Sequence, residues 1–239
     1  MNKPPTSIIA QAVAIPVIIA GVIIVFLTME NQSESAQYSI VMPLAYLLGC
    51  ISWGYILLQL KLGVDVREYG SGRTGMSNVL RTGGVKSAAV VLALDVGKGV
   101  LAVVLARVVI GTTTAEVSAA LAVLIGHNWP VFLQFKGGRG ILTALGGLVI
   151  MAPIAAIIAT AAFLTITGFS RYISLGSVIG VIIGALAVLG LALADVHSDT
   201  YMVYGFIAST VIVWQHRDNL QRIRDGSERR LGQSATKVD

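Results

Sequence analysis

Several apolar runs constrain this chain more than any other feature, because a helix needs about twenty consecutive apolar residues to cross the hydrocarbon core of a bilayer. Of the 239 residues, 55% are hydrophobic and only 12% are charged. Charged residues make up roughly a quarter of an ordinary soluble domain. We therefore predict an all-α fold, a polytopic integral membrane helical bundle with about seven crossings.

The apolar runs are separated by short polar connections. They predict helical segments at 7–28, 38–60, 87–110, 117–135, 141–151, 154–169, 173–194 and 201–214. We expect residues 1–37 to add one transmembrane helix and an outer loop to a single transmembrane domain at 38–215. A basic, partly disordered cytoplasmic tail would follow at 216–239.

The run at 141–169 is interrupted at Ala152-Pro153. Neither of its halves is long enough to span a bilayer comfortably, since a helix rises only about 1.5 Å per residue. We therefore expect a bent or re-entrant helix pair that returns to the side on which it starts.

Lysine and arginine residues gather in the connections at 61–86 and 136–139, at Arg171 and in the tail, whereas the remaining connections carry acidic residues. By the positive-inside rule, both termini and every glycine-rich basic loop lie on the cytoplasmic side of the cell membrane. Arg107, near the outer end of the 87–110 segment, is the one exception. The net charge of +5 thus reports topology rather than nucleic-acid binding.

The stretch 70–81, with the sequence GSGRTGMSNVLR, connects two of the apolar runs. Its glycines let successive backbone N–H groups converge on one anion. Ser71, Ser77 and Asn78 add short donors, and Arg81 adds a planar fork suited to phosphate. The stretch predicts a phosphate or carboxylate site at the membrane edge. A tight turn with topology-setting arginines is the alternative on this loop alone.

Three more stretches, at 126–140, 171–177 and 216–219, are also small, polar and cationic. The predicted topology brings all of them to one face of the bilayer, where together they would enclose an anion and admit lipid laterally between the helices. This agreement favours the phosphate site over topology alone.

Three further ionisable residues lie within or at the ends of the apolar runs. Asp95 and Lys98 share one helix face and are either functional or an internal ion pair. His127 is a base, a ligand or a hydrogen-bonding residue at a helix end. The sequence contains no cluster with metal-ligand spacing and no dinucleotide motif, so we expect no metal and no cofactor.

At these loops the chain resembles the PlsY family of membrane glycerol-3-phosphate acyltransferases. The family patterns GSGNxGATNVxR, GHxxPxFxxFKGGKG, RYxSLxS and HRxNIxRLxxGxE correspond to GSGRTGMSNVLR, GHNWPVFLQFKGGRG, RYISLGS and HRDNLQRIRDGSE. A DxxKG pattern is present at 95–99. The resemblance runs from about residue 46 to 228.

The resemblance implies transfer of an acyl chain from acyl phosphate to glycerol 3-phosphate, giving lysophosphatidic acid and phosphate as the first step of phospholipid synthesis. Membrane lipids would surround the site, and the tail would begin with an active-site motif. The implied catalytic residues are Ser71, Arg81, Arg139, Ser177, His216 and Asn219. The implied substrate- and phosphate-binding residues are Gly70, Gly72, Ser77, Asn78, Lys136, Gly137, Gly138 and Ser174.

The chain departs from the family patterns at Arg73, which replaces asparagine, and at Met76-Ser77, which replaces Ala-Thr. These departures leave open a PlsY-like paralogue that acylates another acceptor. A small-anion transporter is the alternative from another class, because broken helices and helix-end anion sites also suit transporters. The one-sided distribution of the polar clusters argues against transport.

Overall fold

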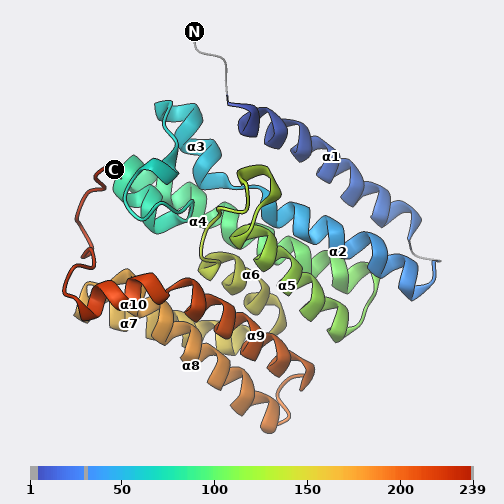
Figure 1. The fold of residues 1–239 in the computed structure, drawn as a ribbon. Helices are drawn as coiled ribbons and strands as arrows, with labels where there is room; N and C mark the ends of the chain where they lie inside the picture. The colour runs from blue at the N-terminus through green and yellow to red at the C-terminus, as the bar shows by residue number, and fades with distance from the viewer. Residues whose placement is uncertain (1–4, 30–31, 238–239) are drawn as a thin grey trace.

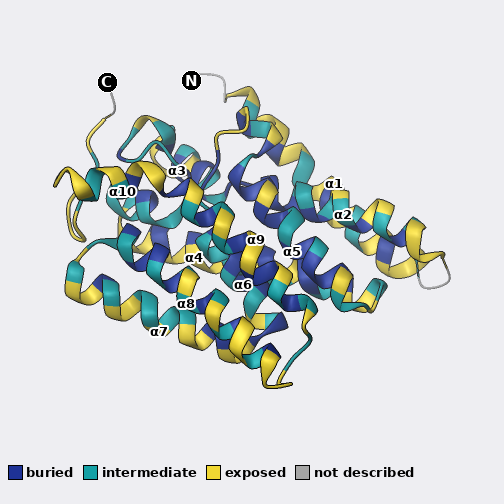
Figure 2. Cartoon of the chain, turned by 60° about the horizontal axis from the view of Figure 1, so that its bottom comes forward, coloured by how far each residue is buried: buried dark blue, intermediate teal, exposed yellow. Residues whose placement is uncertain are grey.

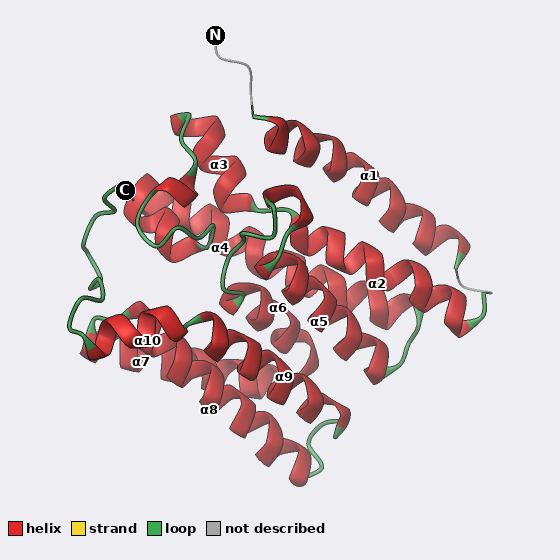
Figure 3. Ribbon diagram, viewed as in Figure 1, coloured by secondary structure: helices red, strands yellow, loops and turns green. Residues whose placement is uncertain are grey.

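The computed structural model describes residues 5–29 and 32–237, and within them the chain is built from α-helices and their connections (Figures 1 and 3). The helices are α1 (Thr6–Thr28), α2 (Glu34–Cys50), α3 (Trp53–Leu62), α4 (Met76–Val109), α5 (Thr113–Asn128), α6 (Ile141–Met151), α7 (Pro153–Ser170), α8 (Ile173–Leu193), α9 (Thr200–Gln215) and α10 (Arg217–Arg224). Short 3-10 helices occupy Val66–Glu68 and Val131–Leu133.

Within the part of the chain that the structure describes, six helical stretches are long and apolar enough to cross a membrane. They are α1, α2 with α3, α4, α5 with the 3-10 helix after it, α7 and α8. The predicted all-α membrane bundle is confirmed. Buried residues gather in its centre, and exposed ones cover the outer faces of α1 and α7 (Figure 2). The sidedness predicted for the two termini stays a prediction.

Small residues bring the central helices into close contact. Gly99 of α4 lies against the backbone of Thr143 and Gly147 of α6, and Gly146 lies against Val96 and its neighbours on α4. A side chain at Gly99 or Gly146 would collide with the backbone of the facing helix. Without a hydrophobic driving force between helices in lipid, such close backbone approach is how membrane helices associate.

The predicted break at Ala152 separates α6 from α7, and Pro153 is the first residue of α7, where its missing N–H costs no helical hydrogen bond. Gly140, at the start of α6, packs beside Asn128 at the end of α5. Arg171, which follows α7, exchanges backbone and side-chain hydrogen bonds with Leu231 of the tail. As expected, the pair returns to the side on which it starts.

Predicted segment boundaries were wrong in three places, one of them at the segment expected at 117–135, because α5 runs from Thr113 to Asn128. The segment expected at 38–60 is broken at Ile51–Ser52 into α2 and α3. The stretch 70–81 is only half a loop, because α4 begins at Met76 and continues across a kink at Gly84, whose φ of 79° favours glycine.

The tail beyond α9 is more regular than expected. It forms α10, and the part that the structure describes then crosses back towards the 70–81 stretch, as the red trace in Figure 1 shows. The N–H of Gly70 donates to the Thr236 carbonyl at 2.9 Å, and the N–H of Ala235 donates to the Arg81 carbonyl at 3.2 Å. These contacts tie residues 229–237 to the start of α4.

Arg107, the exception to the positive-inside pattern, is neutralised by pairing. Its guanidinium donates to both carboxylate oxygens of Glu116 at 2.8 and 2.9 Å and to the carbonyl of Ile150 at 3.0 Å. Tyr201 donates to the same carboxylate at 2.7 Å. Arg107 therefore joins α4 to α5 and α6.

Candidate active site

A cavity of about 360 Å³ opens between α4, α6, α7, α8 and α9. Its polar end is lined by Ser71, Arg73, Ser77, Asn78, Asp95, His127, Arg139, Ser177 and His216. Apolar residues such as Leu145, Phe163 and Val188 line the remainder. One cavity therefore joins a cationic end to an apolar end.

Asn78 organises the first glycine loop from within. It is 1% exposed, and its Nδ2 group lies 2.8 to 2.9 Å from three backbone carbonyls of residues 66–73. Its Oδ1 atom accepts from the N–H of Ser71 at 3.1 Å. A Cβ atom at Gly70 would collide with this oxygen. The Asn78 amide thus shapes the loop that presents Ser71 to the cavity.

The second glycine loop packs directly on the end of α5. The N–H of Gly138 donates to the His127 carbonyl at 3.0 Å, and the N–H of Gly137 donates to the Asn128 carbonyl at 3.2 Å. A Cβ atom at Gly138 would overlap the His127 imidazole. These glycines therefore allow close packing, which carries Arg139 to the cavity, whereas Lys136 is exposed and outside the lining.

Several buried donor atoms in and around this end have no hydrogen-bond partner among the described residues, including Ser71 Oγ, Arg81 Nε and Arg139 Nε. Burial and the neighbouring charges of Arg73 and Arg222 lower the pKa of Arg139 to about 10, which still leaves it charged at neutral pH. A buried donor without an acceptor is costly. An anion in the cavity would remove that cost.

His216 lies at the junction of α9 and α10. Its Nδ1 atom is 2.8 Å from the Ile212 carbonyl, which can only accept, so Nδ1 carries the proton and Nε2 is left as an acceptor. Burial and the nearby Arg139 charge lower the pKa of His216 to about 4. The imidazole is therefore neutral at neutral pH.

Glu228 accepts hydrogen bonds from two residues, Ser174 and Asn219, that the family resemblance assigned to the phosphate site. Its Oε1 atom accepts from Ser174 Oγ at 2.8 Å and from Asn219 Nδ2 at 2.7 Å. Its Oε2 atom accepts from Arg222 Nε at 2.8 Å. Burial alone would raise the pKa of Glu228, but these hydrogen bonds hold it below its usual range. Sequence reasoning did not single out Glu228, although it ends the last motif.

Four of the six residues predicted to be catalytic line the cavity, namely Ser71, Arg139, Ser177 and His216. Arg81 and Asn219 lie outside the lining. Arg81 Nη2 lies 3.4 Å from the Arg229 carbonyl, and Arg81 lines a neighbouring pocket that shares Ile173 with the main cavity. Of the predicted binding residues, Ser77 and Asn78 line the cavity. Those outside the lining are Gly70, Gly72, Lys136, Gly137, Gly138 and Ser174.

Asp95 and Lys98 form a buried ion pair, with Lys98 Nζ 2.9 Å from Asp95 Oδ1. The same Asp95 oxygen is 3.6 Å from His127 Nδ1. Both readings of these charges find support, because the pair is internal while Asp95 and His127 also line the cavity.

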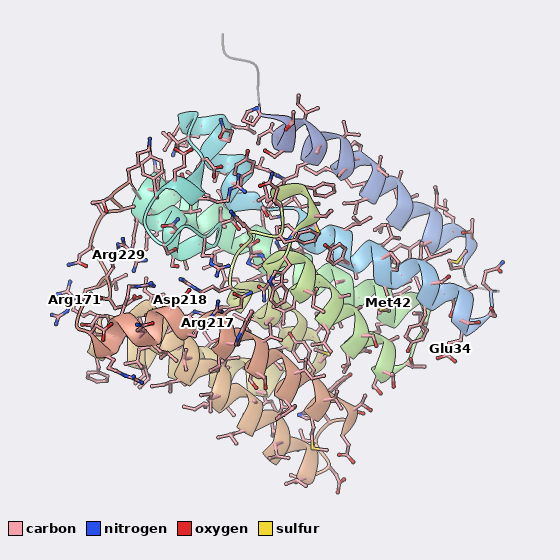
Figure 4. The ribbon with its side chains drawn as sticks, viewed as in Figure 1. Glu34, Met42, Arg171, Arg217, Asp218 and Arg229 are labelled. Atoms are coloured by element: carbon pink, nitrogen blue, oxygen red, sulfur yellow. The ribbon has the colours of Figure 1, made fainter. Side chains whose placement is uncertain are left out.

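Charged side chains gather at the polar end. Figure 4 shows Arg171, Arg217, Asp218 and Arg229 around one end of the bundle, while Glu34 lies at the opposite end. The fold is that of an integral membrane acyltransferase, as comparison with known proteins shows.

Residues 39–226 match the family model described as glycerol-3-phosphate acyltransferase. Glycerol-3-phosphate acyltransferase 3 of Dehalococcoides mccartyi is 43% identical over 213 residues, covering 84% of this chain and 98% of that protein. Glycerol-3-phosphate acyltransferase of Thermoanaerobacter pseudethanolicus is 42% identical over 190 residues, covering 80% and 93%. The chain belongs to this family of membrane acyltransferases.

A solved structure agrees. The crystal structure of PlsY, an integral membrane glycerol 3-phosphate acyltransferase in its glycerol 3-phosphate form, superposes with a TM-score of 0.76 and 33% identity. The match covers 82% of this chain and 96% of that one. The lysophosphatidic acid form matches with a TM-score of 0.74. The resemblance to the PlsY family is confirmed, and acyl transfer is favoured over anion transport.

Proposed function

We propose that the protein transfers an acyl chain from acyl phosphate to the sn-1 hydroxyl of glycerol 3-phosphate, giving lysophosphatidic acid and inorganic phosphate. The reaction would be the first step of phospholipid synthesis at the cytoplasmic face of the cell membrane. The observation that carries the proposal is the single cavity with a cationic end and an apolar end.

The cationic end suits the phosphate groups. Both substrates are anions, so bringing them together requires cations that offset their repulsion. Arg139 and Ser71 each present a buried donor without a partner, and Arg73 lies beside them. Arg81 lines the neighbouring pocket and would join by exchanging its contact with the Arg229 carbonyl, at 3.4 Å, for one with phosphate. Ser177, His216 and Asn219 complete the proposed site.

The apolar end suits the acyl chain. From Ser177 to Val188, α8 lines the cavity over about 16 Å at the helical rise of 1.5 Å per residue. Gly180 and Gly184 lie on this wall and let α8 pack closely on α7, since a Cβ atom would lie 3.0 Å from Phe163 at Gly180 and 2.8 Å from Ala159 at Gly184. Relative to water, an acyl chain buried here is stabilised by about 0.8 kcal/mol per CH₂ group, so this wall can replace the lipid around the chain.

In the proposed reaction the sn-1 oxygen attacks the carbonyl carbon of acyl phosphate, and the carbon–oxygen bond to phosphate breaks. The hydroxyl proton passes to a phosphate oxygen of a substrate, because a histidine with a pKa of about 4 is a weak base. Cationic donors stabilise the oxyanion that forms on the carbonyl. The glycerol 3-phosphate and lysophosphatidic acid forms of PlsY support this acceptor and product.

The test uses purified protein in lipid vesicles with radiolabelled glycerol 3-phosphate and palmitoyl phosphate. We expect labelled lysophosphatidic acid and one equivalent of inorganic phosphate, and no product when palmitoyl-CoA is the donor. A second arm replaces glycerol 3-phosphate with other phosphorylated alcohols to test the paralogue alternative. Product only from another acceptor, or uptake of label without acylation, would contradict the proposal.

A further inference from the structure

Helix α1 faces the bundle through a narrow stripe. Its buried residues are Gln11, Ile18 and Val25, which recur every seven positions, and most of the others are exposed or half-buried. Gln11 is 0% exposed. A buried polar side chain in a membrane helix is costly unless it forms a hydrogen bond. Helix α1 also lies before the residues 39–226 that define the family.

Gln11 forms such a hydrogen bond at the break between α2 and α3. Its Oε1 atom accepts a 2.9 Å hydrogen bond from the N–H of Ser52, which is 3% exposed. A helix break within a membrane frees backbone groups that something else must satisfy. Lys98 satisfies the carbonyl side of the same break, since its Nζ donates to Gly49 at 3.2 Å and to Ile51 at 3.0 Å. Two side chains from two other helices therefore stabilise this one break.

The break is also connected to the cavity. Lys98 holds Asp95 at 2.9 Å, and Asp95 faces His127 at 3.6 Å. The His127 ring lies against Gly138 of the loop that carries Arg139. Asp95, His127 and Arg139 all line the cavity. A continuous series of contacts thus runs from α1 through the break to the cavity wall.

We propose that α1 positions the cavity for acyl transfer, with Gln11 as the positioning residue. Gln11 keeps the α2–α3 break closed, meaning that the backbone groups of the break stay hydrogen-bonded and buried. Gln11 is not one of the residues that line the cavity. It acts through Ser52, Lys98 and Asp95 on His127 and the 136–140 loop. The inference rests on the proposed acyl transfer for its catalytic part only, because closure of the break is measurable without any substrate.

The chain carries its own probe of the break. Cys50 is the single cysteine, it is fully buried, and it is the last residue of α2. The rate at which a maleimide modifies its thiol in vesicles therefore reports opening of the break. Gln11→Met removes the acceptor at nearly constant volume, and Gln11→Glu retains one. Val17→Met is the matched control, because Val17 is 63% exposed on the same helix.

We expect Gln11→Met to raise the labelling rate of Cys50 about tenfold and to lower kcat/KM about tenfold. The variant leaves the buried N–H group of Ser52 without an acceptor, and a factor of about ten corresponds to the cost of one such group. Gln11→Glu should restore both quantities most of the way, and Val17→Met should change neither. The thermal midpoint should move less than the labelling rate, since the opening is local.

Two results would overturn the inference. One is wild-type labelling of Cys50 in Gln11→Met, which would show that Gln11 does not close the break. The other is faster labelling with unchanged kcat/KM, which would show that the break does not act on the cavity. Failure of wild-type protein to acylate glycerol 3-phosphate would instead count against the proposed function, and the labelling result would stand on its own.

Discussion

Asn219 donates a 2.7 Å hydrogen bond from Nδ2 to the Oε1 atom of Glu228, and this contact fixes α10 to the segment that follows it. Ser174 at the start of α8 donates to the same oxygen at 2.8 Å. One buried carboxylate therefore joins two motifs that lie far apart in the sequence. Ser177, three residues after Ser174, and His216, three residues before Asn219, line the cavity next to this junction.

Replacing Glu228 with alanine should destabilise the fold. Ser174, Asn219 and Arg222 would each lose an acceptor, and the expected loss is about 2–3 kcal/mol in the free energy of unfolding. Denaturant unfolding in detergent measures it. Glu68→Ala is the control, because that carboxylate is exposed and 3.8 Å from Lys237. Equal stability of the two variants would refute the structural role given to Glu228.

His216 predicts a pH dependence of stability. Its pKa in the folded protein is lowered to about 4, so the unfolded chain binds the additional proton between that value and the ordinary histidine pKa. Its contribution is complete above about pH 6.5 and is lost as the pH falls towards 4. Between pH 7 and 5 the wild type should lose about 1–2 kcal/mol more than His216→Asn. Parallel unfolding curves for the two proteins over this range would contradict the assignment.

Gly138→Ala should disrupt the second glycine loop. The added methyl group would overlap the His127 imidazole, so either the ring or the loop must shift. We expect activity to fall at least about tenfold, with a stability cost of about 1–3 kcal/mol typical of overpacking. Gly190→Ala is the matched control, since a methyl group there meets open space and favours the helix. A Gly138→Ala enzyme that is as active as Gly190→Ala would contradict the proposed close packing of this loop on His127.

Gly184→Leu should shorten the apolar end of the cavity. Gly184 lines the cavity on α8, and its Cβ position already lies 2.8 Å from the Ala159 methyl group. If the acyl chain occupies this end, kcat/KM should fall for palmitoyl phosphate and should fall less for decanoyl phosphate. The ratio of the two values is the readout. An unchanged ratio would place the acyl chain elsewhere.

The helical bundle was predictable because apolar runs of membrane-spanning length leave a chain few alternatives. The break at Ile51–Ser52 was not, since neither residue is a proline or a glycine and the groups that satisfy it, on Gln11 and Lys98, are distant in sequence. Pattern reasoning also treated Met76 to Arg81 as loop, whereas the structure continues α4 through them and places the kink at Gly84.

The sequence predicted which residues lie at the site better than it predicted what those residues contact. The motifs identify donors that converge at one end of the bundle, and Ser71, Arg139, Ser177 and His216 line one cavity. They do not reveal that Asn219 and Ser174 bind a carboxylate, because nothing in the local pattern separates an acceptor in the protein from one in a substrate. Their contact with phosphate stays a prediction.

The most direct test of the central claim is the rate of lysophosphatidic acid formation by Arg139→Ala. Arg139 brings a buried, unpartnered Nε donor to the polar end of the cavity, so its loss should lower kcat/KM about 10²- to 10³-fold. Arg224→Ala removes an exposed arginine of α10 and should leave kcat/KM unchanged. If kcat/KM of Arg139→Ala lies within about threefold of that of Arg224→Ala, the loss is far smaller than expected. That result would contradict a phosphate site in this cavity.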